Sequence, residues 1–277
     1  MSRIAQRFAQ LKADKRAGLV AYISAGDPEI DVSYQILKGL PGAGADLIEL
    51  GMPFTDPMAD GPSVQLAGQR ALKAGITVDA TFDMVRRFRK ETGDDATPIL
   101  LMGYYNLVYQ RGVERFCKEA AAAGVDGFIL VDLPPEEADE LKPYAVANGL
   151  DTVLLTAPTT DDKRLPAVLK YSSGFVYFVS VLGITGTKSA TEEAVAAHVA
   201  RIRRHTKLPV GVGFGIKTPE QAAAVARHAD AAVVGTAIVD RVKAGLDSNG
   251  KPRPDLVPGV IAFVKTLAES VRGVRKP

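Results

Sequence analysis

The sequence predicts an α/β fold, a (β/α)8 TIM barrel that spans residues 1–277 as a single domain. Short apolar runs alternate with longer helical patterns along the whole chain. Eight such runs are present, and each is almost continuously apolar, as strands of a parallel sheet covered by helices on both faces must be. The length also fits, because eight βα units typically occupy about 250 residues.

The expected elements follow in order along the chain. An amphipathic helix opens it, MSRIAQRFAQLKADKR, with Ile4, Phe8 and Leu11 on one face. The eight strands are expected at residues 18–24, 45–51, 98–104, 126–132, 151–157, 175–181, 208–214 and 230–236. Helical patterns lie between them, and examples are residues 81–92, 112–124, 135–149 and 219–229. A short extra helix, AIVDRVKAGL, follows the eighth strand, and a long helix comes after it.

An open, doubly wound sheet is the alternative to a closed barrel. Such a sheet would usually carry a G-x-G-x-x-G motif after the first strand, and the segment AYISAGDP lacks it. A weak internal repeat also favours a barrel of similar units. The phrases AGADLIELGMP, AGVDGFILVDLP and HADAAVVGTAI each place a small-residue turn and an aspartate before a strand.

Composition excludes several classes of function. Hydrophobic residues make up 47% of the chain and the formal net charge is +2, so nothing indicates nucleic acid or a membrane surface as a partner. No run approaches the roughly 18 apolar residues of a membrane span. The single cysteine, Cys117, forms no disulfide within the chain and fits a reducing compartment, so we expect a cytoplasmic protein. The histidines show no metal-ligand spacing, and no metal site is expected.

Two carboxylates stand out where a barrel places its active site, at the carboxyl ends of the strands. Glu49 lies inside the second apolar run, and Asp60 lies in the loop after it, within LIELGMPFTDPMADGP. Burial should raise the pKa of Glu49 towards neutrality, while Asp60 in a wetter loop should stay ionised. Such a pair suits acid–base catalysis. The alternatives are a buried ion pair for Glu49, and turn capping for Asp60 and, more readily, for Asp56.

Glycines at the ends of the last two strands indicate an anion site. Gly213, Phe214 and Gly215 end the seventh strand, and Gly235 and Thr236 end the eighth. Glycine lets backbone N–H groups approach a phosphate, and the start of the following helix adds a favourable dipole. We therefore expect a phosphate subsite held mainly by neutral donors.

Two further features bear on the chemistry. The link from Gly183 to Glu193, GITGTKSATEE, is either a mobile lid that presents Thr185 to the site or an ordinary solvated loop. Lys217, a conceivable Schiff-base lysine, stands in a polar turn where nothing evident would lower its pKa.

The run ELGMPFTDPMADGP closely resembles the signature of the tryptophan synthase alpha subunit family. The resemblance extends through AYISAGDP, LLMGYYNLVYQ, ILVDLPPEE, TAPTTDD, YFVSVLGITG, GVGFGIKTPEQ and VVGTAIVDR. It implies a (β/α)8 barrel that cleaves indole-3-glycerol phosphate to indole and glyceraldehyde 3-phosphate, a retro-aldol step. It also implies no cofactor in this chain and an alpha2-beta2 heterotetramer, in which a pyridoxal-phosphate beta subunit joins the indole to serine to make L-tryptophan.

The resemblance assigns roles residue by residue. Glu49 would be the principal acid–base catalyst, and Asp60 would hold the indole N–H and stabilise positive charge on the ring. Partner-facing positions would be Pro53, Asp56 and Asn106. Substrate-binding positions would be Tyr22, Met102, Tyr104, Ile129, Leu155, Tyr177, Thr185, Gly186, Gly213, Phe214, Gly215, Gly235 and Thr236.

Three positions depart from what many relatives carry: Tyr22 stands where Phe is common, Thr236 where Ser is common, and Val181 where some relatives have Arg. None removes a catalytic group. Three other readings remain open, namely a stand-alone lyase that releases free indole, a catalytically silent subunit that only activates its partner, and a lysine-dependent aldolase.

Overall fold

The computed structural model describes residues 1–180, 191–213 and 215–274. Within them, nine strands form one sheet in which every neighbouring pair is parallel, in the order β5-β4-β3-β2-β1-β9-β8-β7-β6. The strands are β1 (Gly18–Ser24), β2 (Leu47–Gly51), β3 (Ile99–Gly103), β4 (Gly127–Leu130), β5 (Asp151–Thr152), β6 (Leu155–Thr156), β7 (Val176–Val179), β8 (Val210–Gly213) and β9 (Ala231–Val234).

The two ends of this sheet meet in one short segment. β5 and β6 stand at opposite ends of the strand order, yet only Val153 and Leu154 separate them. Val153 N–H donates to the carbonyl of Phe128 in β4 (2.9 Å), and the carbonyl of Leu154 accepts from Tyr177 N–H in β7 (3.2 Å). The fifth expected strand is thus split into two pieces with different neighbours, and the sheet closes into the predicted barrel.

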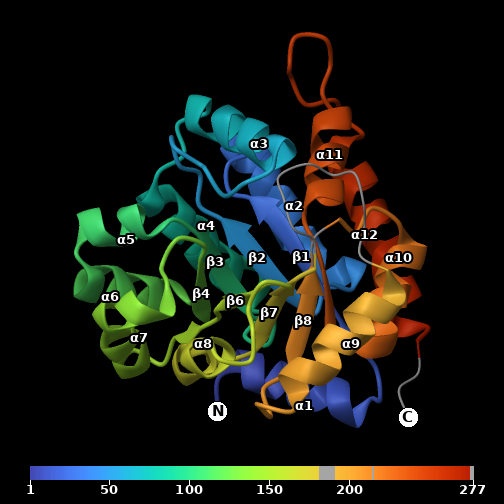
Figure 1. Ribbon diagram of the computed structural model, residues 1–277. Coiled ribbons are helices and arrows are strands. Elements are labelled where there is room, and N and C mark those ends of the chain that lie inside the picture. Colours follow the sequence, from blue (N-terminus) through green and yellow to red (C-terminus); the bar gives the residue numbers. More distant parts are fainter. Residues whose placement is uncertain (181–190, 214, 275–277) are drawn as a thin grey trace.

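Helices surround the sheet (Figure 1). They are α1 (Arg3–Ala13), α2 (Ile30–Ala43), α3 (Pro62–Lys73), α4 (Val78–Thr92), α5 (Tyr105–Arg111), α6 (Val113–Ala123), the 3-10 helix η1 (Pro135–Glu140), α7 (Lys142–Ala147), α8 (Leu165–Tyr171), α9 (Glu192–Arg203), α10 (Pro219–His228), α11 (Thr236–Ala244) and α12 (Leu256–Arg272). The short helix expected after the last strand is α11, and the long final helix is α12.

Most of the expected strands are a few residues shorter in the structure, and Thr236, expected to end the eighth strand, begins α11. Two other segments also differ from what was expected. The single helix expected over 135–149 is η1 followed by α7, because Pro143 in the first turn of α7 lacks the N–H that a continuous helix would need. The expected loop to Glu193 ends earlier, since α9 begins at Glu192. The Thr191 hydroxyl caps this helix by accepting from Ala194 N–H.

The helix α1 closes the amino-terminal end of the barrel. Its buried residues are Ile4, Phe8 and Leu11, the face that the sequence predicts, and they join the apolar cluster of the barrel interior. The rings of Phe8 and Phe175 lie 5.6 Å apart, just before β7 begins. Because this end is closed by side chains, a substrate must enter from the carboxyl ends of the strands.

The aspartates of the internal repeat all make the same contact. Asp46, Asp126 and Asp230 directly precede β2, β4 and β9. Each donates its backbone N–H to the carbonyl of a residue at the start of the preceding strand in the sheet, and its carboxylate accepts that residue's N–H. The partners are Leu19 for Asp46 (carboxylate distance 3.0 Å), Ile99 for Asp126 (2.8 Å) and Val210 for Asp230 (2.8 Å).

An arginine completes each of these contacts. Arg16 binds Asp46 with two nitrogens, at 2.9 and 2.8 Å. Arg89 and Arg3 bind Asp126 at 2.9 and 3.0 Å, and Arg203 binds Asp230 at 2.9 Å. Because Arg3 belongs to α1, the Asp126 contact also fastens that helix beneath the barrel.

Replacing Asp46 by Ala should strongly destabilise the fold. The Asp46 side chain is only 2% exposed, and its loss leaves the Leu19 N–H unpaired. Arg16 would keep only the longer contacts to Asp14 (3.5 Å) and to the Ala17 carbonyl (3.3 Å). We expect a loss of about 3–5 kcal/mol in the free energy of unfolding, measured by urea denaturation. The matched control is Asp83→Ala, whose 70%-exposed carboxylate pairs with Arg86 on α4 and should contribute about 1 kcal/mol or less. Equal losses in the two variants would contradict this account.

Candidate active site

Glu49 lies in the middle of β2 and points into the barrel. It is in register with Tyr22 of β1 and with Leu100 of β3, which belongs to the interior cluster. Glu49 is 1% exposed, and none of the described residues hydrogen-bonds its buried Oε1. Burial raises the pKa of Glu49 from 4.5 to about 8. Within the described chain this carboxyl has no cationic partner, which argues against the buried ion pair.

Asp60 lies in the loop between β2 and α3 and is half-buried, so its surroundings are drier than the sequence suggested. Burial raises the pKa of Asp60 to about 6, and a hydrogen bond with the Tyr104 hydroxyl acts in the opposite direction. At neutral pH Asp60 is therefore mainly ionised while Glu49 is mainly protonated. The two carboxyls have the separated pKa values that an acid–base pair requires.

Tyr104, at the end of β3, holds the loop that carries Asp60. Its hydroxyl accepts a hydrogen bond from Ala59 N–H at 2.9 Å, and its ring lies 5.2 Å from that of Phe54. Tyr104 is 2% exposed, and burial raises its pKa to about 12, so the hydroxyl stays protonated. Tyr104, expected as a pocket residue, therefore contacts both the backbone of this loop and the carboxylate of Asp60.

Two buried tyrosines lie close to Glu49. Burial raises the pKa of Tyr22 and of Tyr177, and the charge of Glu49 contributes to both shifts. Asp60 contributes to the shift of Tyr22 as well, which places that hydroxyl within the field of both carboxyls. The hydroxyls occupy space that a Cβ on Gly51 or Gly213 would overlap. Glycine at these two strand ends therefore leaves room for the rings.

The remaining expected pocket residues form an apolar wall. Met102, Ile129 and Leu155 lie on three different strands and pack with Tyr177 in the cluster of the barrel interior. Met102 and Leu155 are only partly buried. The structure thus brings together at one end of the barrel side chains that are far apart in the sequence.

The expected anion site is described in part. Gly213 ends β8, which pairs with β9, and α11 begins at Thr236 directly after Gly235. Thr236 and Gly215 are exposed, and the backbone of Gly215 has a positive φ of 82° that suits glycine. The first-turn N–H groups of a helix lack partners within the helix, so α11 offers donors at this mouth.

Several expected positions lie outside the described residues: Thr185 and Gly186 of the possible lid, Phe214, and Val181.

The three expected partner-facing residues lie at or near the surface. Asp56 and Asn106 are exposed and Pro53 is half-buried. Pro53 and Asp56 belong to the loop after β2, and Asn106 belongs to the first turn of α5. The ring contact between Phe54 and Tyr104 joins these two segments, so the positions belong to neighbouring parts of one surface.

Sequence reasoning missed the residues that hold this loop in place. Gln65 of α3 hydrogen-bonds the loop backbone, and Arg70 of the same helix pairs with Asp27 at 2.7 and 2.9 Å. Asp27 is 3% exposed and follows β1 in the segment AGDP, where an acid beside an apolar strand was the available signal. Asp132, just after β4, accepts Tyr105 N–H at the start of α5 (2.7 Å).

The other chemistries gain no support from the geometry. Lys217 is exposed, and burial raises the pKa of the Cys117 thiol to about 12, so this cysteine is a packed side chain. The described residues contain no group of three or more side chains arranged to hold a metal ion. No helix in the described parts of the chain combines the length and apolar character needed to cross a membrane.

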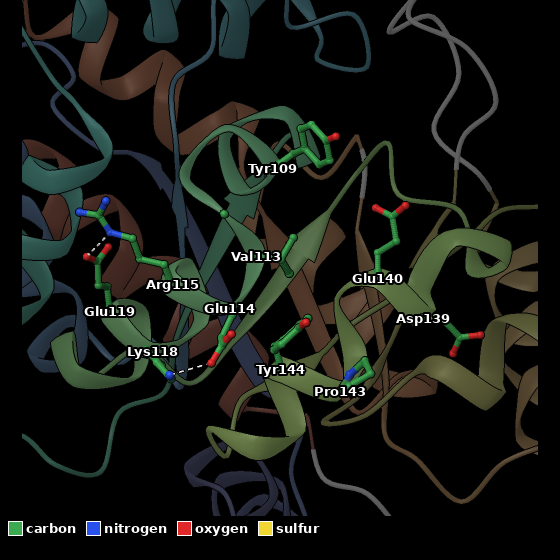
Figure 2. A pocket seen from close by; sticks show the side chains of 11 residues that line it. Tyr109, Val113, Glu114, Arg115, Lys118, Glu119, Asp139, Glu140, Pro143 and Tyr144 are labelled. Carbon is green, nitrogen blue, oxygen red and sulfur yellow. Dashed lines mark hydrogen bonds and ion pairs between the residues drawn. The ribbon is translucent and has the colours of Figure 1, made fainter.

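A groove on the outer surface lies apart from these residues. It has a volume of about 1020 Å³ and is formed by α5, α6, η1 and α7 (Figure 2). Its charged groups largely pair among themselves or with neighbours, as in Lys118 with Glu114 (2.7 Å) and Glu140 with the Tyr105 hydroxyl (2.8 Å). The groove contains neither Glu49 nor Asp60, and we assign it no catalytic role.

Known proteins match this chain over nearly all of its length. The family model described as tryptophan synthase alpha chain matches residues 8–265. The tryptophan synthase alpha subunit of Legionella pneumophila is 36% identical, with a TM-score of 0.89 over 99% of this chain and 100% of that one. A tryptophan synthase structure from Mycobacterium tuberculosis is 34% identical, with a TM-score of 0.87 over 98% of each chain. This chain belongs to the tryptophan synthase alpha chain family.

Proposed function

We propose that Glu49 and Asp60 carry out the reaction of this family, the retro-aldol cleavage of indole-3-glycerol phosphate to indole and glyceraldehyde 3-phosphate. The observation that carries this assignment is the buried carboxyl of Glu49, which faces the barrel interior with one oxygen unpaired among the described residues. An unpaired buried acid is costly to a fold, so a role in chemistry accounts for its presence.

Glu49 moves the protons of the reaction. Protonated at the start, it delivers a proton to the indole carbon that carries the glycerol chain, and the ring becomes a positively charged indolenine. The resulting carboxylate then takes the proton of the adjacent glycerol hydroxyl. As the C=O bond of the aldehyde forms, the C–C bond breaks and its electrons return to the ring, which restores indole. A pKa of about 8 suits a group that must both give and take a proton near neutrality.

Asp60 stabilises the charge that appears on the ring. Its pKa of about 6 keeps it anionic near neutral pH, and it would accept the indole N–H as positive charge develops there. A fixed carboxylate in a partly dry site stabilises such charge more than water does. Ring and phosphate would be held separately. Thr185 would lie beside the substrate within reach of Asp60. The indole would pack on Tyr22, Met102, Tyr104, Ile129, Leu155, Tyr177 and Phe214, and the phosphate end would be surrounded by Gly186, Gly213, Gly215, Gly235 and Thr236.

The partner is the tryptophan synthase beta subunit, with which the alpha chain forms an alpha2-beta2 heterotetramer. The alpha chain carries no cofactor, and pyridoxal phosphate belongs to the beta subunit, which consumes the indole. We place Pro53, Asp56 and Asn106 at the contact with this subunit, and their position at the surface near the Asp60 loop supports this. A cytoplasmic location is also part of the proposal, and the free buried thiol of Cys117 is compatible with it.

The variant Glu49→Gln should abolish cleavage, because an amide of the same size neither gives nor takes the proton. We expect indole release to fall about 10²- to 10⁴-fold, with and without the beta subunit. The control Glu136→Gln removes an exposed carboxylate on η1 and should leave the rate unchanged. Circular dichroism and co-elution with the beta subunit check fold and assembly. Wild-type activity in Glu49→Gln would contradict the assignment and favour a lysine-dependent aldolase, whereas a wild-type chain that releases no indole would favour a silent subunit.

The pH profile of kcat/KM for cleavage should be bell-shaped. Activity requires ionised Asp60 and protonated Glu49, so it should rise as the pH passes about 6 and fall as the pH passes about 8. Steady-state indole release measured across this range tests both limbs. In Asp60→Asn the residual activity should lose its acid limb and keep the alkaline one. A wild-type profile without either limb would contradict the pair.

A further inference from the structure

The position of the Asp60 carboxylate depends on a turn whose side chains bury little surface. The turn runs from Pro57 to Asp60 and is closed by the Asp60 N–H, which donates to the Pro57 carbonyl at 3.1 Å. Met58 within it is 70% exposed, and Ala59 is exposed as well. Since little apolar burial holds this turn, its position must come from hydrogen bonds.

One side-chain amide spans both ends of that turn. The Nε2 group of Gln65 donates to the carbonyl of Asp60 at 2.9 Å and to the carbonyl of Pro57 at 3.3 Å. A side-chain NH2 group has two N–H donors, so both bonds can form together. Gln65 is half-buried near the start of α3, which begins at Pro62, immediately after the loop.

The helix that carries Gln65 is firmly attached to the barrel. Arg70, further along α3, forms a two-pronged ion pair with the buried Asp27 in the loop after β1. Val64 and Ala67 pack in one apolar cluster with Tyr22 of β1. Gln65 therefore hydrogen-bonds the turn from a helix whose own position is fixed.

The opposite side of the turn is held from β3. The Tyr104 hydroxyl accepts Ala59 N–H at 2.9 Å, as described above. The turn thus lies between Tyr104 on one side and Gln65 on the other. Without Gln65, the turn would keep the bond from Asp60 N–H to the Pro57 carbonyl and the bond from Ala59 N–H to Tyr104. The side-chain bonds from α3 to the carbonyls of Pro57 and Asp60 would be lost.

We propose that Gln65 is the positioning residue that sets the Asp60 carboxylate in the catalytic mouth, a role that rests on the proposed function of Asp60. Gln65 would touch no reacting atom and would act only through the backbone of the turn. Its loss would let Asp60 move outward into water. The indole N–H would then lose a correctly placed partner as charge develops.

The test compares Gln65→Met with Gln69→Met. Both substitutions replace an amide by an apolar chain of similar length on α3, but Gln69 is exposed, and the side-chain amide that bonds the turn's carbonyls is that of Gln65. For Gln65→Met we expect kcat and kcat/KM for indole release to fall together, about 10- to 100-fold, since a displacement near 1 Å has effects of this size. Gln69→Met should match the wild type.

A second readout separates positioning from mere support of the fold. Burial raises the pKa of Asp60, so an outward movement should lower it, and the acid limb of the kcat/KM profile should shift to lower pH in Gln65→Met. Gln65→Glu, which keeps the size but offers no N–H, should slow the reaction in the same way and serves as the second variant if Gln65→Met does not fold. An unshifted acid limb, or wild-type kcat in a folded variant, would overturn the proposal.

A double-mutant cycle distinguishes this inference from the proposed function. If Gln65 acts only through Asp60, Gln65→Met should add little further loss in an Asp60→Asn background. Losses that multiply independently would refute the positioning role while leaving the function of Asp60 intact. Wild-type activity in Asp60→Asn alone would instead refute the proposed function, and this inference with it.

Discussion

Closure of a parallel sheet into a ring is the constraint on which the rest of this molecule depends. Inward side chains fill the ring, and α1 seals one end with Ile4, Phe8 and Leu11. Only the carboxyl ends of the strands stay open, so every polar group with a role in chemistry must gather there. The dry interior that this closure creates also gives Glu49 its raised pKa. Architecture and acid strength therefore have the same physical origin.

The sequence predicts most of this architecture because its signals are local. Apolar runs place all eight barrel strands, and the spacing of Ile4, Phe8 and Leu11 identifies the buried face of α1. The split of the fifth strand at Val153 and Leu154 could not be predicted. It arises because successive residues of this segment bond to β4 on one side and to β7 on the other, which is a property of the closed ring.

The sequence singles out the two candidate acids, and it says less about the residues that surround them. Glu49 could be singled out because a carboxylate inside an apolar strand is unusual. The partial burial of Asp60 was missed, because a loop rich in Pro, Gly and Asp is normally expected to be solvent-exposed. In the structure, Tyr104 and Gln65 hydrogen-bond the backbone of this loop from two sides. Gln65 gives no signal of its own, because a glutamine near the start of a helix is ordinary until its bonding partners are known.

The aspartates before β2, β4 and β9 each bond to the strand that comes immediately before theirs in the chain. Each contact therefore lies within one βαβ unit and can set the alignment of two strands before any ring exists. Asp151, at the seam where the ring closes, differs: its carboxylate accepts the hydroxyl of Ser2, the cap of α1, at 2.6 Å. The barrel is thus aligned within its βαβ units by these aspartates. At Asp151, where the ring closes, it is held by α1, the helix that also covers the amino-terminal end.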